Sequence, residues 1–375
     1  MRIALIGAGS IGKRHLINSI QSGVRHITIY DSEQKKLKEA KKKAEETFNK
    51  AKSFLQIELV EKQKDLFKKG VSFDAMIIAT PPSSHPFYLE KALQFKIPVL
   101  CEKPLCKDDE NFRNLCSLIC EINRRKILNM TAYNYRFWPQ LQKLKSIIET
   151  GKYGKVLSIR GSFSENLRDW HPWEGINFYM SSKRLGGGAL LDESHLIDIV
   201  RWIFGEIKTI SAINKTISSL RREKIFKTDD IVEIIAELKS GAVASIHMDL
   251  FGKYHEKKLE IITEKSKIEW HFDNTDLRSN NIKIFSGKRR LQSSQVGTRE
   301  APKILSAGKL ERNAMYLRQI KHFLHCIKNK KQIRGDVACL KDGFQTMSVL
   351  QAARRSARCG RKVEVLQNAF YSDKK

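Results

Sequence analysis

The sequence lacks three features: a CxxC cysteine pair, a long hydrophobic run and an uninterrupted apolar N-terminus. Its 375 residues include seven cysteines, an odd number without the CxxC pair of structural metal sites, so we expect neither a disulfide framework nor a bound metal. No run approaches the roughly 18 apolar residues of a membrane span. Glycines interrupt the apolar N-terminus, so we expect no signal peptide. These absences predict a cytoplasmic protein that does not act at a membrane.

Acidic residues are also few, at 41 against 69 Lys and Arg, which gives a net charge of +28. The lysines are spread over the chain and peak in residues 35–52, where glutamates are interleaved and no aromatic run could stack on bases. This pattern is typical of a solvated amphipathic helix. We therefore expect no nucleic-acid partner, and the charge favours an anionic small-molecule substrate instead.

The chain is too long for one ordinary core and predicts two domains. Strands alternate with helices over residues 1–126, which predicts an α/β dinucleotide-binding domain with a parallel sheet. Short turns join the later strands, which predicts a second, α+β domain over residues 127–336 with a mainly antiparallel sheet. We expect a C-terminal helix and tail over residues 337–375 to pack back near the first domain. The second-domain strands are expected at 156–163, 207–213, 231–238, 242–250, 270–272 and 282–285.

A glycine motif with the right surroundings opens the chain. The all-apolar strand Ile3–Ile6 runs into it, a helical pattern follows, and a second strand ends in Asp31, 19 residues beyond the last glycine. This context is that of a dinucleotide-binding turn, in which Asp31 accepts hydrogen bonds from the ribose and favours NAD over NADP. A tight turn without a ligand is the alternative. The expected cofactor-binding residues here are Gly7, Gly9, Ser10, Ile11, Gly12 and Asp31.

Polar residues follow two further strands of the same sheet. Ligands of open parallel sheets bind beyond the carboxyl ends of the strands, so Thr80, Pro81, His85, Glu102 and Lys103 are expected at the cofactor. Lys103 is a candidate catalytic group, because a buried ammonium can stabilise developing negative charge. An ordinary surface lysine is the alternative.

The segment GGGALLDESHLID, Gly186–Asp198, carries a carboxylate and an imidazole on a predicted helix. We expect one long helix that contains Gly186–Phe204 and covers one face of the second sheet. At 100° per residue Asp192 falls within the apolar stripe, and His195 lies about 40° beyond Ile199. Both side chains should therefore point inward, where burial without a partner is costly. Such a pair could be a structural hydrogen bond or part of a polar site.

The motifs together resemble the Gfo/Idh/MocA oxidoreductase family across nearly the whole chain. The resemblance is carried by GAGSIGKRH, ATPPSSH, CEKP, YNYRFWP and GGGALLDESHLID in the family's order, and by the closing helix GFQTMSVLQAARRSARCGRKVEV. It implies a Rossmann domain joined to an open-faced sheet domain that often mediates oligomerisation, a nicotinamide cofactor, sugar-type substrates and a cis bond before Pro104. The catalytic Lys maps to Lys103, and the family's Asp and His map to Asp192 and His195. In many members that Asp and His are four residues apart, whereas here they are three apart, a variant that resembles a subgroup of surface-polysaccharide or nucleotide-sugar pathways.

We therefore predict hydride transfer between NAD and a CH–OH carbon of a sugar, sugar acid or nucleotide sugar. His195 would act as general base, Lys103 would stabilise the substrate oxygen, and Asp192 would orient the imidazole or a substrate hydroxyl. Two alternatives stay open: a redox-neutral enzyme in which NAD oxidises the sugar transiently, and a non-catalytic NAD sensor. The expected substrate contacts are Tyr135, Arg136, Trp170 and His171, of which Arg136 would suit a carboxylate or phosphate.

Overall fold

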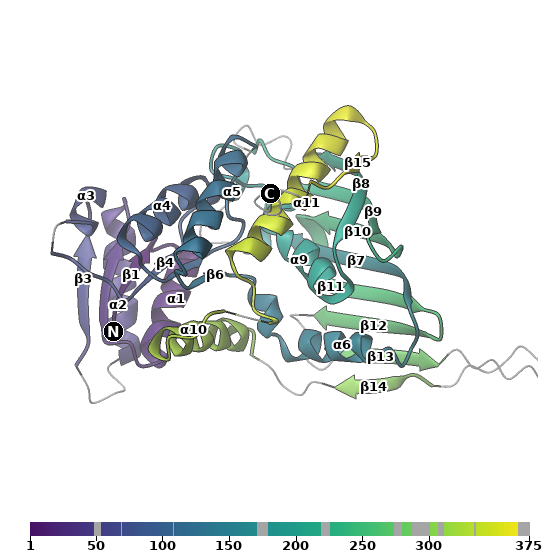
Figure 1. Ribbon diagram of the computed structural model, residues 1–375, viewed down its shortest axis with the longest axis horizontal. Coiled ribbons are helices and arrows are strands. Elements are labelled where there is room, and N and C mark those ends of the chain that lie inside the picture. Colours follow the sequence, from purple (N-terminus) through teal and green to yellow (C-terminus); the bar gives the residue numbers. More distant parts are fainter. Residues whose placement is uncertain are drawn as a thin grey trace, which may run out of the picture.

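The computed structural model describes residues 1–48, 54–68, 70–107, 109–170, 179–218, 226–273, 280–286, 301–306, 311–333 and 335–366. Two sheets lie side by side, with helices between and around them (Figure 1). The buried apolar residues of both form one continuous core. None of the described helices is both long and apolar enough to cross a membrane.

The first sheet is parallel, with strand order β3-β2-β1-β4-β5-β6. Its central strands are all-apolar because helices cover both faces, with α1 and α2 on one side and α4 and α5 on the other. The order reverses between β1 and β4, which opens a crevice at their carboxyl ends. The elements are β1 (Arg2–Ile6), α1 (Ser10–Gln21), β2 (His26–Tyr30), α2 (Gln34–Phe48), β3 (Gln56–Val60), α3 (Gln63–Leu66), β4 (Ala75–Ile78), η1 (Pro82–Ser84), α4 (His85–Phe95), β5 (Val99–Cys101), α5 (Asp109–Arg124) and β6 (Asn129–Thr131).

The second sheet has the order β14-β13-β12-β11-β7-β10-β9-β8-β15. Strands β7 and β10 run parallel, and the other described pairs run antiparallel, which confirms the mainly antiparallel sheet. The elements are η2 (Asn134–Phe137), α6 (Pro139–Glu149), β7 (Val156–Asn166), α7 (Leu167–Trp170), η3 (Tyr179–Ser181), α8 (Ala189–Asp192), α9 (Ser194–Phe204), β8 (Ile207–Lys215), β9 (Ile231–Leu238), β10 (Val243–Asp249), β11 (Phe251–Thr263), β12 (Ser266–Asp273), β13 (Asn281–Ser286), β14 (Lys303–Ser306), α10 (Asn313–Lys328), α11 (Leu340–Cys359) and β15 (Val363–Glu364).

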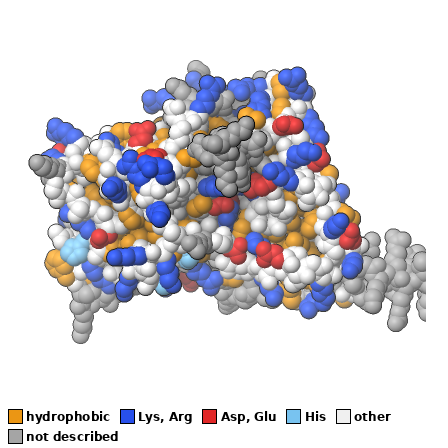
Figure 2. Space-filling model, viewed as in Figure 1, with side chains coloured by type: hydrophobic (Ala, Val, Ile, Leu, Met, Phe, Trp, Pro, Cys, Tyr) orange, Lys and Arg blue, Asp and Glu red, His pale blue; other side chains and the backbone are white. Residues whose placement is uncertain are grey.

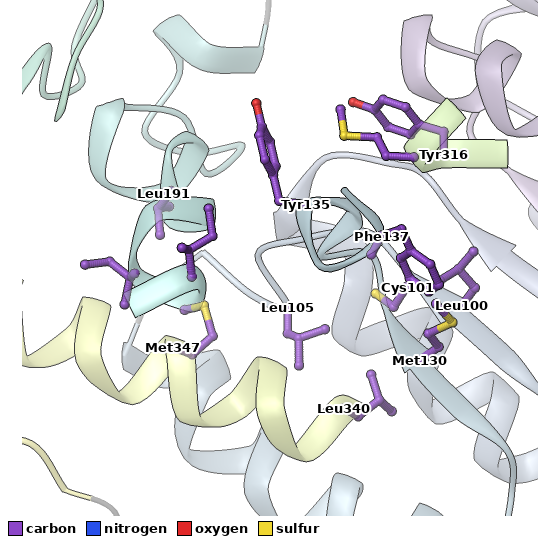
Figure 3. Close-up of a cluster of buried hydrophobic side chains, with 14 of the residues drawn as sticks. Leu100, Cys101, Leu105, Met130, Tyr135, Phe137, Leu191, Tyr316, Leu340 and Met347 are labelled. Carbon is purple, nitrogen blue, oxygen red and sulfur yellow. The ribbon is translucent and has the colours of Figure 1, made fainter. Parts of the chain in front are cut away.

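The two parts of the chain are more interleaved than the expected division at residues 126 and 336. Strand β6 completes the first sheet beyond residue 126, and α10 packs on α1 of the first domain. Helix α11 packs on β8 and α9 of the second domain and also contacts α5 and β6. Apolar side chains from both parts meet where these elements converge, as Leu100, Met130, Leu191 and Met347 do in Figure 3. Residues of both parts therefore form the core between the two sheets.

The positive charge is distributed over the surface. On the face drawn in Figure 2, Lys and Arg side chains are scattered over both parts of the molecule, with Asp and Glu between them. Helix α2 exposes most of its lysines and buries Leu37, Ala40 and Ala44, as an amphipathic surface helix should. This arrangement agrees with the solvated helix that the sequence predicts.

Candidate active site

A cavity of about 1510 Å³ lies between the two parts of the chain. One side is formed by the carboxyl ends of β1, β2, β4 and β5, and the other by η2, the α8–α9 segment, β11 and the start of α10. It is long enough to hold a dinucleotide beside a second ligand. The expected residues that line it are Gly7, Gly9, Ser10, Ile11, Asp31, Thr80, Pro81, Glu102, Lys103, Tyr135, Asp192 and His195.

The three motif glycines have different roles. Gly7 has φ +96°, and a Cβ there would lie 2.5 Å from the Ala79 carbonyl oxygen. A Cβ on Gly12 would lie 2.0 Å from the Gly7 carbonyl oxygen, so Gly12 serves close packing of α1 and does not line the cavity. A Cβ on Gly9 would meet nothing within 4 Å, which leaves the backbone open to a ligand. This cradle at the start of α1 fits a pyrophosphate, because free N–H groups and the helix dipole favour an anion there.

Asp31 stands at the end of β2 and lines the same cavity. One carboxylate oxygen accepts a hydrogen bond from the Ala8 N–H at 2.7 Å, and the other accepts one from the Glu33 N–H at 2.9 Å. The carboxylate thus fixes the glycine turn and keeps lone pairs for ribose hydroxyls. The donor and acceptor set of this end of the cavity fits NAD.

His85 does not contact the cavity, and its expected role as a cofactor ligand is corrected. The imidazole is fully buried, with Nδ1 2.8 Å from the Pro104 carbonyl oxygen and Nε2 2.7 Å from that of Thr80. It therefore ties the turn after β4 to the turn after β5. The Lys103–Pro104 peptide bond is cis.

Lys103 projects from the end of β5 across to the second domain. Its Nζ donates to the Asp192 carbonyl oxygen at 2.6 Å and lies 3.5 Å from Asp192 Oδ1. Burial alone would lower the pKa of Lys103, but the carboxylates of Asp192, Glu193 and Glu102 outweigh it and raise the pKa. The side chain, only 13% exposed, is therefore a held cation at the cavity wall.

Glu102, beside it, is held from the first domain. His15 Nε2 lies 2.7 Å from Glu102 Oε1, and the Lys103 N–H donates to Glu102 Oε2 at 3.3 Å. His15 is fully buried, so its contact with Glu102 restrains the carboxylate. Glu102 thus supports the position of Lys103.

The prediction of one long helix is wrong, because the helix is interrupted at Glu193. Helix α8 ends at Asp192, Glu193 has φ −85° and ψ 18°, and α9 begins at Ser194. Gly188 (φ +111°) precedes α8, and a Cβ there would lie 2.6 Å from Asp229 Oδ1, so the glycine turn permits close packing. The break turns Asp192 toward Lys103 and Tyr179, whose hydroxyl donates to Asp192 Oδ1.

Among the described residues no hydrogen bond joins Asp192 to His195, so the first of the two expected roles of Asp192, orienting the imidazole, is not supported; the second, orienting a substrate hydroxyl, stays a prediction. His195 Nδ1 is buried without a hydrogen-bond partner, although the ring lines the cavity. The Tyr135 and Tyr133 rings flank it, with centroids at 4.8 and 5.7 Å. Burial lowers the pKa of His195 well below its usual value, and the cations of Lys103, Lys257 and Arg312 add to the effect. The imidazole is thus neutral and can accept a proton.

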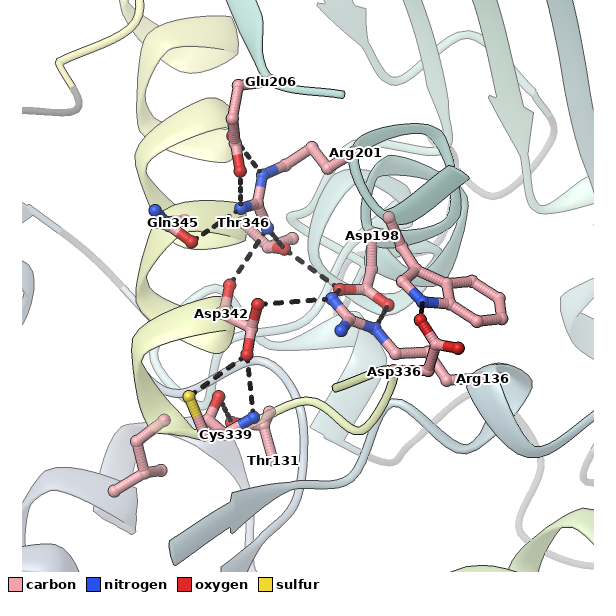
Figure 4. A network of polar contacts seen from close by, with 12 residues as sticks. Thr131, Arg136, Asp198, Arg201, Glu206, Asp336, Cys339, Asp342, Gln345 and Thr346 are labelled. Atoms are coloured by element: carbon pink, nitrogen blue, oxygen red, sulfur yellow. Dashed lines mark hydrogen bonds and ion pairs between the residues drawn. The ribbon is translucent and has the colours of Figure 1, made fainter. Parts of the chain in front are cut away.

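Arg136 is a structural residue, and its expected role as a substrate contact is corrected. Its guanidinium forms a two-point ion pair with Asp198, at 2.7 and 2.9 Å, and approaches Asp342 at 3.7 Å. All of this lies away from the cavity, in a polar network that joins η2, α9 and α11 (Figure 4). Asp198 is 1% exposed, although it is off the apolar stripe, because α9 is buried on all sides. The network links the two helices that support the site.

Two of the expected substrate contacts cannot be placed. The side chain of Trp170, at the end of α7, and the whole of His171 lie outside the described residues. Tyr135 does line the cavity, next to His195.

Five residues of the cavity region were not expected from the sequence: Glu165, Tyr179, Glu193, Lys257 and Arg312. Lys257 Nζ lies 2.5 Å from Glu165 Oε1 and 3.1 Å from Glu193 Oε2, and all three are nearly fully buried. One signal was available: Lys257 is two residues before Leu259 and four before Ile261, so a period of two places it on the buried face of β11. Arg312 carries no such signal.

Two models of one protein family match successive segments of the chain. Residues 1–129 match the family model of the "oxidoreductase family, NAD-binding Rossmann fold", and residues 141–269 match that of the "GFO/IDH/MocA C-terminal domain". The inositol 2-dehydrogenase of Corynebacterium glutamicum is 26% identical over 255 residues, which cover 67% of each chain.

Solved structures share the fold over the full length. Levoglucosan dehydrogenase in complex with NADH and L-sorbose aligns over 98% of this chain and 99% of its own, with a TM-score of 0.80 and 20% identity. The WlbA dehydrogenase from Bordetella pertussis, in complex with NADH and UDP-GlcNAcA, aligns over 97% and 98%, with a TM-score of 0.73 and 19% identity. At these identities the likeness shows the fold.

Proposed function

The chain belongs to the Gfo/Idh/MocA family of oxidoreductases, and from this premise we propose that it transfers a hydride between NAD and a hydroxyl-bearing carbon of a sugar-type substrate. The observation that carries the proposal is the cavity itself. A dinucleotide cradle at one end continues into a chamber where a held cation, Lys103, and a neutral imidazole, His195, line the same space. Several buried polar atoms of that chamber have no hydrogen-bond partner among the described residues, including the Asn134 amide, Asp192 Oδ2 and Glu193 Oε1. A polyhydroxylated ligand supplies both donors and acceptors to such atoms.

The residues divide the work in the following way. When bound, the nicotinamide supplies the hydride acceptor or donor. Lys103 donates a hydrogen bond to the substrate oxygen and stabilises its developing negative charge. His195 accepts the hydroxyl proton, and Asp192 with Tyr179 holds Lys103 in place. The Tyr133 and Tyr135 rings exclude water from the imidazole.

A turnover and thermal-shift screen tests this function. The protein would be incubated with NAD or NADP and panels of neutral sugars, sugar acids and nucleotide sugars, with cofactor reduction followed by absorbance. We expect at least one sugar-type compound both to raise the melting temperature and to reduce NAD. Tight NAD binding with neither reduction of NAD nor conversion of any panel sugar would instead favour the sensor alternative.

The cofactor preference rests on Asp31. Its negative charge should repel a 2′-phosphate, so NAD(H) should bind more tightly than NADP(H), by on the order of tenfold or more. Asp31→Ala should narrow this ratio, and so should Asp31→Asn, which keeps an acceptor for the Ala8 N–H. Calorimetric titration measures both affinities. Tighter binding of NADP(H) to the unaltered protein would contradict the assignment.

We also propose that the substrate is anionic and belongs to a surface-polysaccharide or nucleotide-sugar pathway. We propose further that the protein is a cytoplasmic homo-oligomer, assembled through the outer face of the second sheet. The seven cysteines are all free, which suits a reducing compartment. Ile213, Ile235 and Val243 lie 47–55% exposed on the neighbouring strands β8, β9 and β10, and the strand register places them on one face. Exposed apolar side chains grouped in this way are typical of an interaction surface.

Light scattering after size exclusion tests the oligomer. We expect a dimer or tetramer, and we expect Ile235→Glu to shift it toward the monomer by placing a charge in the apolar interface. The matched control is Lys38→Glu on the exposed face of α2, which should leave the mass unchanged. A monomeric wild type at high concentration would contradict the proposal.

A further inference from the structure

A group of buried charges lies at the inner end of the cavity, beside His195. It consists of Glu165 on β7, Glu193 at the helix break, Lys257 on β11 and Arg312 just before α10. Lys257 forms ion pairs with two carboxylates, whose oxygens lie 2.5 and 3.1 Å from its Nζ. Its charge is held by the protein and does not by itself attract a ligand.

Arg312 differs from Lys257 in having no such partner. Its Nε is buried and has no hydrogen-bond partner, and within the described part of the chain no carboxylate forms an ion pair with its guanidinium. The residue nevertheless lines the cavity together with Tyr135, His195 and Tyr316. A guanidinium presents five donors in a planar fork, and leaving the buried Nε–H of Arg312 without an acceptor is costly. Arg312 is therefore arranged to meet a partner that comes from the cavity.

The ion pairs already formed near His195 leave Arg312 to a ligand. Asp192 lies 3.5 Å from Lys103, and Glu165 and Glu193 form ion pairs with Lys257, so of these three cations only Arg312 has no carboxylate of the described residues within ion-pair distance. Burial raises the pKa of Glu193 to about 7, with Glu165 and Asp192 adding to the effect against the opposing pull of Lys257. Near neutral pH part of Glu193 is thus protonated, which reduces the negative charge that faces Arg312.

We propose that Arg312 is the specificity residue of the substrate site and binds a carboxylate on the sugar ring that is oxidised. This inference rests on the proposed function and names its substrate class as sugar acids. A carboxylate matches the planar fork by two parallel hydrogen bonds. Arg312 and His195 line the same chamber, so we place the carboxylate on the sugar unit whose hydroxyl reacts.

Matched pairs of sugars test the proposal. The probes are uronic acids and the neutral aldoses of the same configuration (glucuronate with glucose, galacturonate with galactose, mannuronate with mannose), each free and as the UDP derivative. We expect kcat/KM with NAD to be higher for the acid of the reactive pair. Arg312→Met should lower it for the acid by roughly 10- to 100-fold, mainly through KM, and should change it little for the neutral sugar. Arg312→Lys should restore part of the loss.

Controls separate this inference from folding and from the proposed function. Arg318→Met removes an exposed arginine from α10, the helix that follows Arg312, at a position that does not line the cavity, and should change neither kinetic constant. Melting temperatures with NADH, with and without each uronate, report binding independently of turnover. If no sugar reduces NAD but a uronate stabilises the wild type and not Arg312→Met, the proposed function fails, whereas Arg312 stands as the carboxylate-binding residue of the cavity. Equal losses for acid and neutral sugars, an unchanged ratio, or no binding of any uronate would overturn it.

Discussion

Replacing Lys103 with methionine should lower turnover by roughly 10²- to 10⁴-fold while leaving the affinity for NAD nearly intact. Methionine keeps much of the length and the apolar stem but removes the ammonium. In the wild type that ammonium is held by the Asp192 carbonyl at 2.6 Å and is kept charged by three carboxylates. The lost interaction is one that strengthens as the substrate oxygen becomes negative, so the loss should appear mainly in kcat.

Steady-state kinetics and calorimetric titration with NAD measure the two parts of this prediction. Lys38→Met, on the exposed face of α2, serves as the control for removal of one lysine charge and should behave as wild type. Two results would contradict the role of Lys103: turnover within a few-fold of wild type, or a loss explained entirely by weaker NAD binding.

Replacing His195 with alanine should also lower turnover by about 10²- to 10⁴-fold, and it should alter the pH profile. The buried imidazole has a pKa well below its usual value, so it remains a proton acceptor throughout the neutral range. The acid limb of kcat/KM in the wild type should accordingly lie below the ordinary histidine pKa of about 6.5. His195→Ala should lack this limb.

The same shift predicts a pH dependence of stability. Because the folded state binds the proton less well than the unfolded state, the stability attached to neutral His195 is present above about pH 6.5 and is lost as the pH falls toward the lowered pKa. Urea denaturation at a series of pH values should show a smaller loss of unfolding free energy below pH 6.5 in His195→Gln than in wild type.

If His195→Ala kept its turnover and the acid limb of its pH profile, a base other than His195 would be required. The pKa values of Lys103 and Tyr135 are both raised, Tyr135 to about 12, which makes either a poor acceptor at neutral pH.

The residues that sequence reasoning placed in the cavity share one property: a local pattern fixes their backbone. Gly7 and Gly9 follow a buried strand, and Lys103 follows another, so each falls at the carboxyl edge of a parallel sheet. Asp31 ends the neighbouring strand. The order of strands and the position of this edge could therefore be predicted before any tertiary contact was known.

What could not be predicted depends on contacts between distant segments. Periodicity treats 186–204 as one helix, whereas the contact of Asp192 with Lys103 accompanies a break at Glu193. Arg136 resembles a ligand-binding arginine until Asp198, 62 residues later, takes its guanidinium. Arg312 lies in a stretch with no motif, and only the fold brings it beside His195.

The central claim is that the hydrogen on a substrate CH–OH carbon leaves as hydride for the nicotinamide, and deuterium transfer tests it most directly. The sugar that the screen identifies would be prepared with deuterium on the carbon that is oxidised, reacted with NAD in a single turnover, and the cofactor analysed by mass spectrometry. We expect one deuterium in each NADH formed, in amounts equal to the oxidised sugar, and none with Lys103→Met on the same timescale. Consumption of the sugar with no net NADH, with the deuterium returned to the product, would contradict net oxidation and support the redox-neutral alternative. Oxidised sugar accompanied by unlabelled NADH would contradict the hydride-transfer mechanism itself.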